Sequence, residues 1–399
     1  MDSKGREKGL RKTELSQFLS CVAASYKMKI PLFKKGDTPD IPLAVSIGFL
    51  VASGIALLAS ASFELGELRY GDSWYYLKAQ LGGGAALGLI GFLICYKIYY
   101  RFWQKLSPLL LILNIILLAL VFTPLGVTSG GATRWIALGP ITFQPSELLK
   151  ITYILYLAAW LSGRGKKHVS RGTQGIIPFA TVSALITLLL ILQPATSIVV
   201  ILLAAGFVVL FLGGARLRHV ASIAIPAIAL LALITSISGY RYSRIEKFLD
   251  GLRNPAQASY HIQQARAALQ AGGIFGSGYQ HSHAKIKRIP AVINDSIFAI
   301  AGSEFGFIGS ITLIACFAFI AWRSYILAVR CKNKFGALLL GGFGMIIAVQ
   351  AFIHIAATSG LVPATGVPLP FISYGGTALA VFLTMSGIML NVTKYSEKE

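Results

Sequence analysis

Acidic side chains at the edges of long apolar stretches are the residues of this sequence best suited to chemistry. Asp295 lies in KIKRIPAVINDSIFAIAGSEFGFIG, residues 285–309, where a basic segment meets an apolar run. A carboxylate at such a position can act as a general base toward a hydroxyl group, because burial raises its pKa. The structural alternative is that Asn294 or Asp295 caps the following helix. Glu304, nine residues further along, is expected to be a paired structural acid.

Three cationic residues lie seven to ten positions before Asp295, namely Lys285, Lys287 and Arg288. They end a 57-residue connection, residues 238–294, which holds eight Lys or Arg residues and three histidines. Connections of this length are usually functional or disordered. We expect a phosphate-bearing headgroup to bind to the three cations and so to lie against Asp295. The alternative is a solvated loop whose charges only keep it soluble.

A second charged group precedes another apolar run. Glu147 and Lys150 are three residues apart and therefore share a helical face, where they can form an ion pair. The pair is either structural or positions a phosphate, a metal ion or a catalytic acid. Arg134, beside Trp135, is a candidate substrate-binding residue or an interfacial anchor.

The composition is that of a polytopic, all-α membrane protein. Of 399 residues, 55% are hydrophobic and 13% are charged, and the mean hydropathy is +0.69. Apolar runs of membrane-spanning length recur along the chain. Ten spans are predicted: Ile41–Ser62, Leu77–Tyr96, Ser107–Phe122, Pro145–Leu161, Ile176–Leu192, Ala195–Leu212, Val220–Ile237, Asp295–Trp322, Phe335–Thr358 and Gly376–Val392.

The positive charges indicate the orientation of these spans. The net charge of +21 does not indicate a nucleic-acid partner, because the positive residues lie in the connections between apolar runs. Both termini are predicted to be cytoplasmic, with the loop 238–294 outside. The expected domains are a basic tail (1–40), the ten-span membrane domain (41–392) and a short tail (393–399). Within the first tail, Arg11–Lys29 is either flexible or an amphipathic helix on the membrane surface.

The last connection, GLVPATGVPLPFISYGG at residues 360–376, is too rich in proline and glycine to be a continuous helix. Irregular backbone at membrane depth is tolerated where it lines a cavity. We therefore expect this loop to form a cavity wall facing Asp295, with Ser373 and Tyr374 as candidate substrate-binding residues.

Several of these motifs, in this order, are similar to those of the SEDS family of cell-wall proteins, the FtsW, RodA and SpoVE group. The resemblance runs from about Ile41 to Val392 and is carried by GATRWIALGPITFQPSELLK (131–150), Gln193-Pro194, RIEKFLD (244–250), QQARAALQAGGIFGSG (263–278), IPAVINDSIFAIAGSEFGFIG (289–309) and the last loop.

The resemblance implies a peptidoglycan glycosyltransferase that uses lipid II. A sugar hydroxyl of one lipid-linked disaccharide would attack the anomeric carbon of another and release undecaprenyl pyrophosphate. The family's proposed catalytic aspartate corresponds to Asp295, and Arg134, Glu147 and Lys150 match its R-W and Q-P-S-E-x-x-K patterns. A divalent cation, Mg²⁺ or Mn²⁺, could offset the charge of the leaving group; no organic cofactor is implied.

Some neighbours of these residues depart from the family pattern. Ala291 stands in place of the glutamate of the family's L-P-E pattern. Ile293 and Ser296 stand in place of the first and last residues of its H-T-D-F pattern, and Ser303 stands in place of the first glutamate of its E-E pair. Ala195 replaces the aspartate of its Q-P-D turn. These departures affect the residues that would support Asp295 or bind a metal ion, and they leave Asp295 itself in place.

Within the family, the basic N-terminal extension and residues 60–80 look more like the division member FtsW than the elongation member RodA. The resemblance then implies a multi-pass protein of the bacterial inner membrane at the division septum. Its partners would be a class B penicillin-binding transpeptidase and other division proteins. A RodA-like elongation polymerase, a lipid II flippase and a non-catalytic division scaffold are the alternatives.

Overall fold

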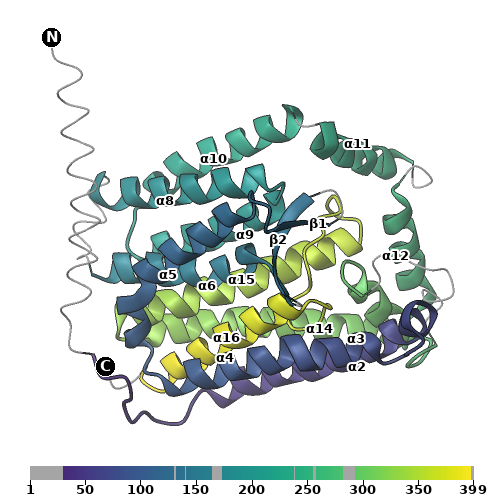
Figure 1. Cartoon of the computed structure of the whole chain (residues 1–399), viewed down its shortest axis with the longest axis horizontal. Coiled ribbons are helices and arrows are strands. Elements are labelled where there is room, and N and C mark those ends of the chain that lie inside the picture. Colours follow the sequence, from purple (N-terminus) through teal and green to yellow (C-terminus); the bar gives the residue numbers. More distant parts are fainter. Residues whose placement is uncertain are drawn as a thin grey trace.

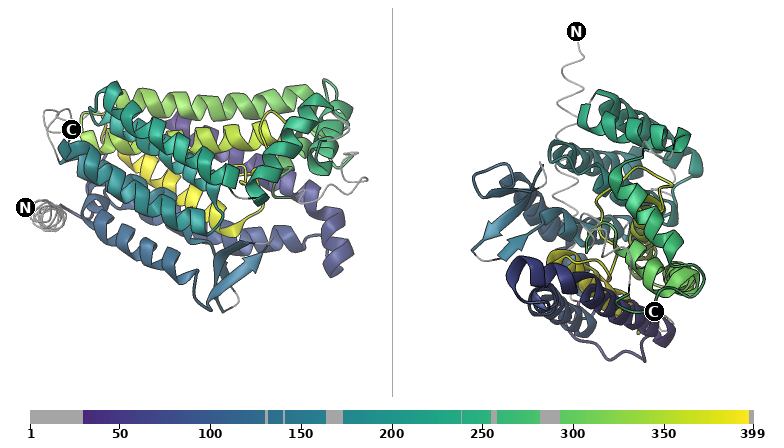
Figure 2. Two further views of the ribbon diagram at one scale, coloured as in Figure 1. Left: turned by 90° about the horizontal axis from the view of Figure 1, so that it is seen from above. Right: turned by 90° about the vertical axis from the view of Figure 1, so that its right-hand side faces the viewer.

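The computed structural model describes residues 30–129, 132–139, 141–163, 173–237, 239–254, 258–281 and 293–396. Its helices lie side by side in one bundle (Figures 1 and 2). They are α2 (Ile41–Tyr70), α3 (Tyr75–Ala79), the π-helical turn η1 (Gln80–Ala85), α4 (Ala86–Lys97), α5 (Arg101–Leu120), α6 (Pro145–Ser162), α8 (Thr173–Leu192), α9 (Thr196–Leu212), α10 (Leu217–Ile237), α11 (Gly239–Arg253), α12 (Tyr260–Ala271), α14 (Ile297–Arg330), α15 (Lys334–Thr358) and α16 (Gly376–Thr393).

Each predicted span coincides with helix, so the all-α, multi-pass class is confirmed. Seven of the described helical segments are long and apolar enough to cross a membrane, and α8 and α9 add shorter apolar helices. Several helices are longer than predicted, and the largest differences are at α2, which continues past Ser62 to Tyr70, and α14, which continues past Trp322 to Arg330. The suggested helix Arg11–Lys29 lies outside the described residues.

The most enclosed helices are α6, α15 and α16, whose side chains are buried on nearly every face. A helix that is apolar all round is expected inside a bundle. In contrast, α10 buries none of its side chains and lies along one edge of the bundle. From its end, α11 crosses to α12 (Figure 1). The loop predicted between the seventh and eighth spans is therefore helical over much of its described part.

A small antiparallel sheet, which the sequence analysis did not predict, joins α5 to α6. It has the order β1 (Gly126–Ser129), β2 (Ala132–Leu138), β3 (Ile141–Phe143). Trp135 pairs with Val127 in one neighbouring strand, and Ile136 pairs with Phe143 in the other. The sheet fixes the backbone direction at Arg134 and Trp135.

A break in α14 holds the loop after α12 against the bundle. Gly306 has φ of 65° and interrupts the helix, a conformation that glycine adopts without strain. The loop after α12 satisfies the freed backbone groups: the Ser277 amide donates to the Ser303 carbonyl (2.9 Å), and the Phe307 amide donates to the Gly273 carbonyl (2.9 Å). A Cβ on Gly276 would lie 2.1 Å from the Glu304 carbonyl oxygen. Two glycine-containing motifs far apart in the sequence thus form one interlocked unit.

Candidate functional site

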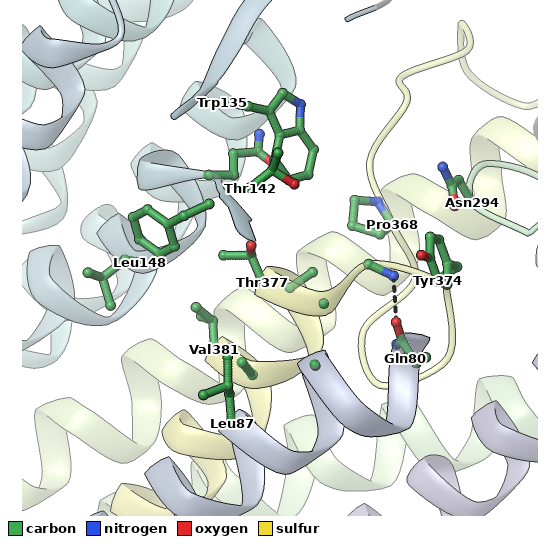
Figure 3. Close-up of a pocket in the computed structure, with 18 of the residues that line it drawn as sticks. Gln80, Leu87, Trp135, Thr142, Leu148, Asn294, Pro368, Tyr374, Thr377 and Val381 are labelled. Carbon is green, nitrogen blue, oxygen red and sulfur yellow. Dashed lines mark hydrogen bonds between the residues drawn. The ribbon is translucent and has the colours of Figure 1, made fainter. Parts of the chain in front are cut away.

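A cavity of about 700 Å³ opens at the end of the bundle where α16 begins. Figure 3 shows Trp135, Thr142 and Leu148 on one side and Asn294, Pro368 and Tyr374 on the other. The walls come from η1, α4, the sheet, α6, α16 and the last loop. Its mouth therefore combines the sheet, the segment before α14 and the last loop, which are distant in sequence.

Asp295 lies in the wall of this cavity, on the segment just before α14, and its side chain is exposed. The N-cap residue of α14 is Ser296, so the alternative in which Asn294 or Asp295 caps this helix is wrong. Neighbouring loops hold the backbone here. The Ser373 hydroxyl donates to the Asn294 carbonyl (2.8 Å), and the Thr358 hydroxyl donates to the Asp295 carbonyl (3.3 Å). The carboxylate is thereby presented to the cavity on a fixed backbone.

Charges from three elements act on Asp295. Desolvation by the surrounding protein raises the pKa of this carboxyl group, while the positive charges of His261 on α12, Arg244 on α11 and Arg134 on β2 oppose the rise. A carboxylate whose pKa is raised is a stronger base and can still be ionised near neutral pH. The site therefore combines a base with cations that can accept a negatively charged group.

Two smaller cavities adjoin the first. One, of about 410 Å³, shares Arg134 and Gln144 with it, and another, of about 120 Å³, shares Asp295. Gly366 lines all three cavities. It has φ of +65°, and a Cβ there would lie 3.7 Å from Oδ2 of Asp295. Asp295 thus lies where cavities on either side of the last loop meet. These cavities have room for two groups of a substrate, one on each side of Asp295.

Arg134 lies between two of these cavities and bonds to the turn between α8 and α9. Its Nε donates to the Gln193 carbonyl (3.1 Å), and its Nη2 donates to the Pro194 carbonyl. These bonds hold the sheet against the α8–α9 turn. Its positive charge still acts on Asp295, so Arg134 both anchors the sheet and contributes to the charge of the site.

Glu147 and Lys150 form the ion pair expected from their spacing. The Lys150 ammonium lies 2.7 and 2.8 Å from the two carboxylate oxygens, and both side chains are buried. Lys150 also lies over the ring of Phe382 on α16, 5.1 Å from its centroid. Glu147 lines the 410 Å³ cavity, whereas Lys150 is fully enclosed. Of the two residues, only Glu147 can therefore contact a group bound in that cavity, and Lys150 holds Glu147 in place.

The remaining predicted residues divide into four groups. Tyr374 lines the main cavity, and its ring packs edge-on against Tyr76 (5.3 Å between centroids). The Ser373 hydroxyl is buried and also accepts a bond from the Leu369 amide (2.8 Å), so it holds the loop. Glu304 is buried and accepts a bond from the Ser60 hydroxyl. The other candidates, Lys285, Lys287 and Arg288, lie outside the described residues.

Several polar residues that position the site were not selected from the sequence. The Gln80 side chain accepts a bond from the Gly375 amide (3.1 Å; dashed in Figure 3). On α15, Gln350 donates to the Pro368 carbonyl (2.8 Å), and Nδ1 of His354 lies 2.8 Å from the Val367 carbonyl. All three are buried polar side chains in apolar runs. Their position within apolar runs is the sequence feature that could have identified them, because a buried polar group requires a hydrogen-bond partner.

The described residues do not contain a ready-made metal site. Nowhere in this part of the chain do three or more His, Cys, Asp or Glu side chains gather closely enough to hold a metal ion. Oxygen ligands from several residues are what a protein-built Mg²⁺ or Mn²⁺ site requires. We therefore derive no step through a metal ion.

Comparison with known proteins identifies the relatives of this chain. Residues 42–398 match the cell cycle protein family of FtsW, RodA and SpoVE. The sequence is 34% identical over 364 residues to a probable peptidoglycan glycosyltransferase FtsW of Saccharophagus degradans, covering 90% of this chain and 94% of that protein. It is 31% identical over 363 residues to stage V sporulation protein E of Bacillus subtilis, covering 91% and 99%.

Solved structures show the same fold. A chain from a study of polymerization and crosslinking by a peptidoglycan synthase complex matches with a TM-score of 0.73 and 28% identity, covering 90% of this chain and 99% of that one. The crystal structure of Thermus thermophilus rod shape determining protein RodA matches with a TM-score of 0.68 and 26% identity, covering 90% and 98%. The fold and the sequence therefore point to the same relatives.

Proposed function

This chain belongs to the FtsW/RodA/SpoVE family of peptidoglycan glycosyltransferases, and we propose that it polymerises lipid II into glycan strands during cell division. The role in division is supported by the names of the FtsW relatives. The observation that carries the proposed chemistry is the position of Asp295, where cavities meet beside Arg134, Arg244 and His261.

In the proposed reaction, Asp295 accepts the proton of the attacking sugar 4-hydroxyl. The hydroxyl oxygen bonds to the anomeric carbon of the second lipid-linked sugar. The bond between that carbon and the phosphate oxygen breaks, and undecaprenyl pyrophosphate leaves with the bonding electrons. Arg244 and Arg134 offset the charge that develops on the pyrophosphate. The sugars would occupy the cavities beside Asp295, with the lipid tails extending into the surrounding bilayer.

The assembly and location follow from the same relatives. A class B penicillin-binding transpeptidase is the proposed partner, supported by the similarity to a chain of a peptidoglycan synthase complex. The protein would lie in the bacterial inner membrane at the division septum. The first and last described segments meet, since the Asp37 amide donates to the Lys394 carbonyl (3.0 Å). That contact supports the two termini lying on one side of the membrane.

Reconstitution tests the proposed function directly. The full-length protein is placed in liposomes with lipid II and the transpeptidase, and the glycan length and the release of undecaprenyl pyrophosphate are measured. We expect polymer and equivalent pyrophosphate release. Movement of lipid II across the bilayer without polymer would favour the flippase. Neither activity, in conditions where a related synthase polymerises, would favour the scaffold.

The pH dependence gives a second test, through a residue that influences Asp295 without being the base. Asp295 must be ionised to accept a proton, so activity is lost as the pH falls through its raised pKa. The positive charge of His261 lowers that pKa, so His261→Asn should raise it further. We expect the acidic limb of kcat/KM for polymerisation to move to higher pH, with little change on the alkaline side, where an imidazole is uncharged.

His281→Asn is the matched control, because this exposed histidine contacts the Tyr279 carbonyl and lines none of the three cavities. Its acidic limb should coincide with that of the wild type. An unshifted limb for His261→Asn, with a normal limb for the control, would show that His261 does not act on the base.

A further inference from the structure

A second polar cavity lies at the opposite end of the bundle from Asp295. It has a volume of about 520 Å³ and is formed where the segment before α2 meets the ends of α4 and α16. Its lining includes three lysines, two tyrosines and one carboxylate: Lys34, Lys97, Lys394, Tyr96, Tyr395 and Asp37. Among these described lining residues the ammonium groups outnumber the acid, so the cavity is suited to an anion.

The cavity has a fixed shape because the two ends of the described chain are bonded together. The Tyr395 hydroxyl donates to the Lys34 carbonyl (2.6 Å), and the Tyr99 amide donates to the Leu32 carbonyl (2.9 Å). Gly36 fits tightly in this contact, since a Cβ there would lie 2.8 Å from the Cβ of Lys394. At the start of α2, Asp40 forms an ion pair with Arg323 (2.6 Å). The segment that closes the cavity is thus tied to α14 and to the residues that follow α4 and α16.

Aromatic rings hold two of the ammonium groups in place. Lys34 lies 5.2 Å from the ring centroid of Tyr99 and 5.5 Å from that of Tyr395. Lys394 lies over the ring of Tyr96 and donates to the Tyr96 carbonyl (3.1 Å). These contacts orient the cations without neutralising them. Burial lowers the pKa of Lys394, and an anion beside it would favour its charged form.

The surroundings of the cavity indicate which anion fits. The cavity lies at the level where α4 and α16 end and α2 begins, which is the edge of the membrane-spanning region. The adjoining part of α4 exposes four large apolar side chains, Leu89, Ile90, Leu93 and Ile94. A free phosphate ion would use the lysines alone. A phospholipid would use both surfaces, with its headgroup in the cavity and its acyl chains along α4.

We propose that this cavity binds the phosphate headgroup of an anionic phospholipid in the cytoplasmic leaflet, between Lys34, Lys97 and Lys394. Basic pockets between transmembrane helices on this side of a membrane suit such headgroups. The bound lipid would join the ends of α4 and α16 to the segment before α2. The site lies at the other end of the bundle from Asp295 and does not depend on the proposed catalytic role of that residue.

The test is lipid binding by the full-length protein in detergent micelles, followed by native mass spectrometry. Phosphatidylglycerol, phosphatidylcholine and inorganic phosphate are the three probes. The wild type should retain phosphatidylglycerol at least about tenfold more tightly than phosphatidylcholine. The triple variant Lys34→Gln, Lys97→Gln, Lys394→Gln should weaken phosphatidylglycerol binding by about tenfold or more, because each lysine near an anionic headgroup contributes to its attraction.

The control is the variant Lys35→Gln, Arg330→Gln, Lys332→Gln, which removes the same charge from exposed residues outside the cavity. It should bind phosphatidylglycerol within about twofold of the wild type, as expected for charges that do not contact the lipid. The single variant Lys97→Gln changes an exposed residue and should fold even if the triple variant does not. It should weaken phosphatidylglycerol binding severalfold. Equal loss in the control, equal binding of the two lipids, or displacement of the lipid by millimolar inorganic phosphate would overturn the proposal.

Discussion

Replacing Asp295 with asparagine is expected to lower the rate of glycan polymerisation by about 10²–10⁴-fold, the usual contribution of a positioned general base. Asparagine has nearly the same size and keeps the backbone that Ser373 and Thr358 hold through hydrogen bonds. It cannot accept the hydroxyl proton. The measurement is the initial rate of lipid II consumption by purified protein, with substrate binding measured separately. We expect the rate to fall while the protein remains folded and binds lipid II.

Asp72→Asn is the matched control for this variant. Asp72 is on a short turn after α2, pairs with Lys78 (2.8 Å) and lines none of the three cavities around Asp295. Its replacement should leave the polymerisation rate within about twofold of the wild type, the usual result for a surface ion pair. Equal rates for Asp295→Asn and the wild type would show that Asp295 is not the base of the polymerisation reaction.

The spans and two features of the site could be predicted from local sequence. Apolar length identifies a membrane helix without knowledge of its neighbours. The pairing of Glu147 with Lys150 follows from helical spacing alone. The position of Asp295 beside the last loop followed from composition, because irregular backbone at membrane depth must line a cavity or be covered by protein. The spans and the ion pair each depend on one short segment, whereas the position of Asp295 also required the last loop.

The supporting contacts could not be predicted, because they join segments far apart in the chain. Gln80 bonds to Gly375, and Arg134 bonds to the carbonyls of Gln193 and Pro194. The three-stranded sheet was missed because its strands are short and its pairing depends on the turns between them. The N-cap alternative for Asp295 failed for a similar reason. Thr358 and the last loop, rather than a local capping bond, fix the backbone there.

Breaking the buried ion pair is the second change with a large expected effect. Lys150→Met would leave Glu147 buried without its cation. Removing one partner of a buried pair typically costs about 3–5 kcal/mol, because the other charge stays desolvated. We expect a clear fall in the thermal midpoint of the purified protein, followed by tryptophan fluorescence and by the fraction that stays monodisperse. Lys78→Met, at the exposed pair with Asp72, is the control and should leave the thermal midpoint nearly unchanged.

The double variant Glu147→Gln, Lys150→Met separates a structural role of the pair from a catalytic one. It removes both charges, so most of the stability lost in Lys150→Met should return. Glu147 also lines the 410 Å³ cavity, whereas Lys150 has no exposed surface. If the double variant regains both stability and polymerisation, the ion pair serves to insert α6 into the membrane and to hold it in the bundle. If stability returns but polymerisation does not, Glu147 contributes its charge to the substrate cavity. A Lys150→Met protein as stable as the wild type would contradict the buried pair itself.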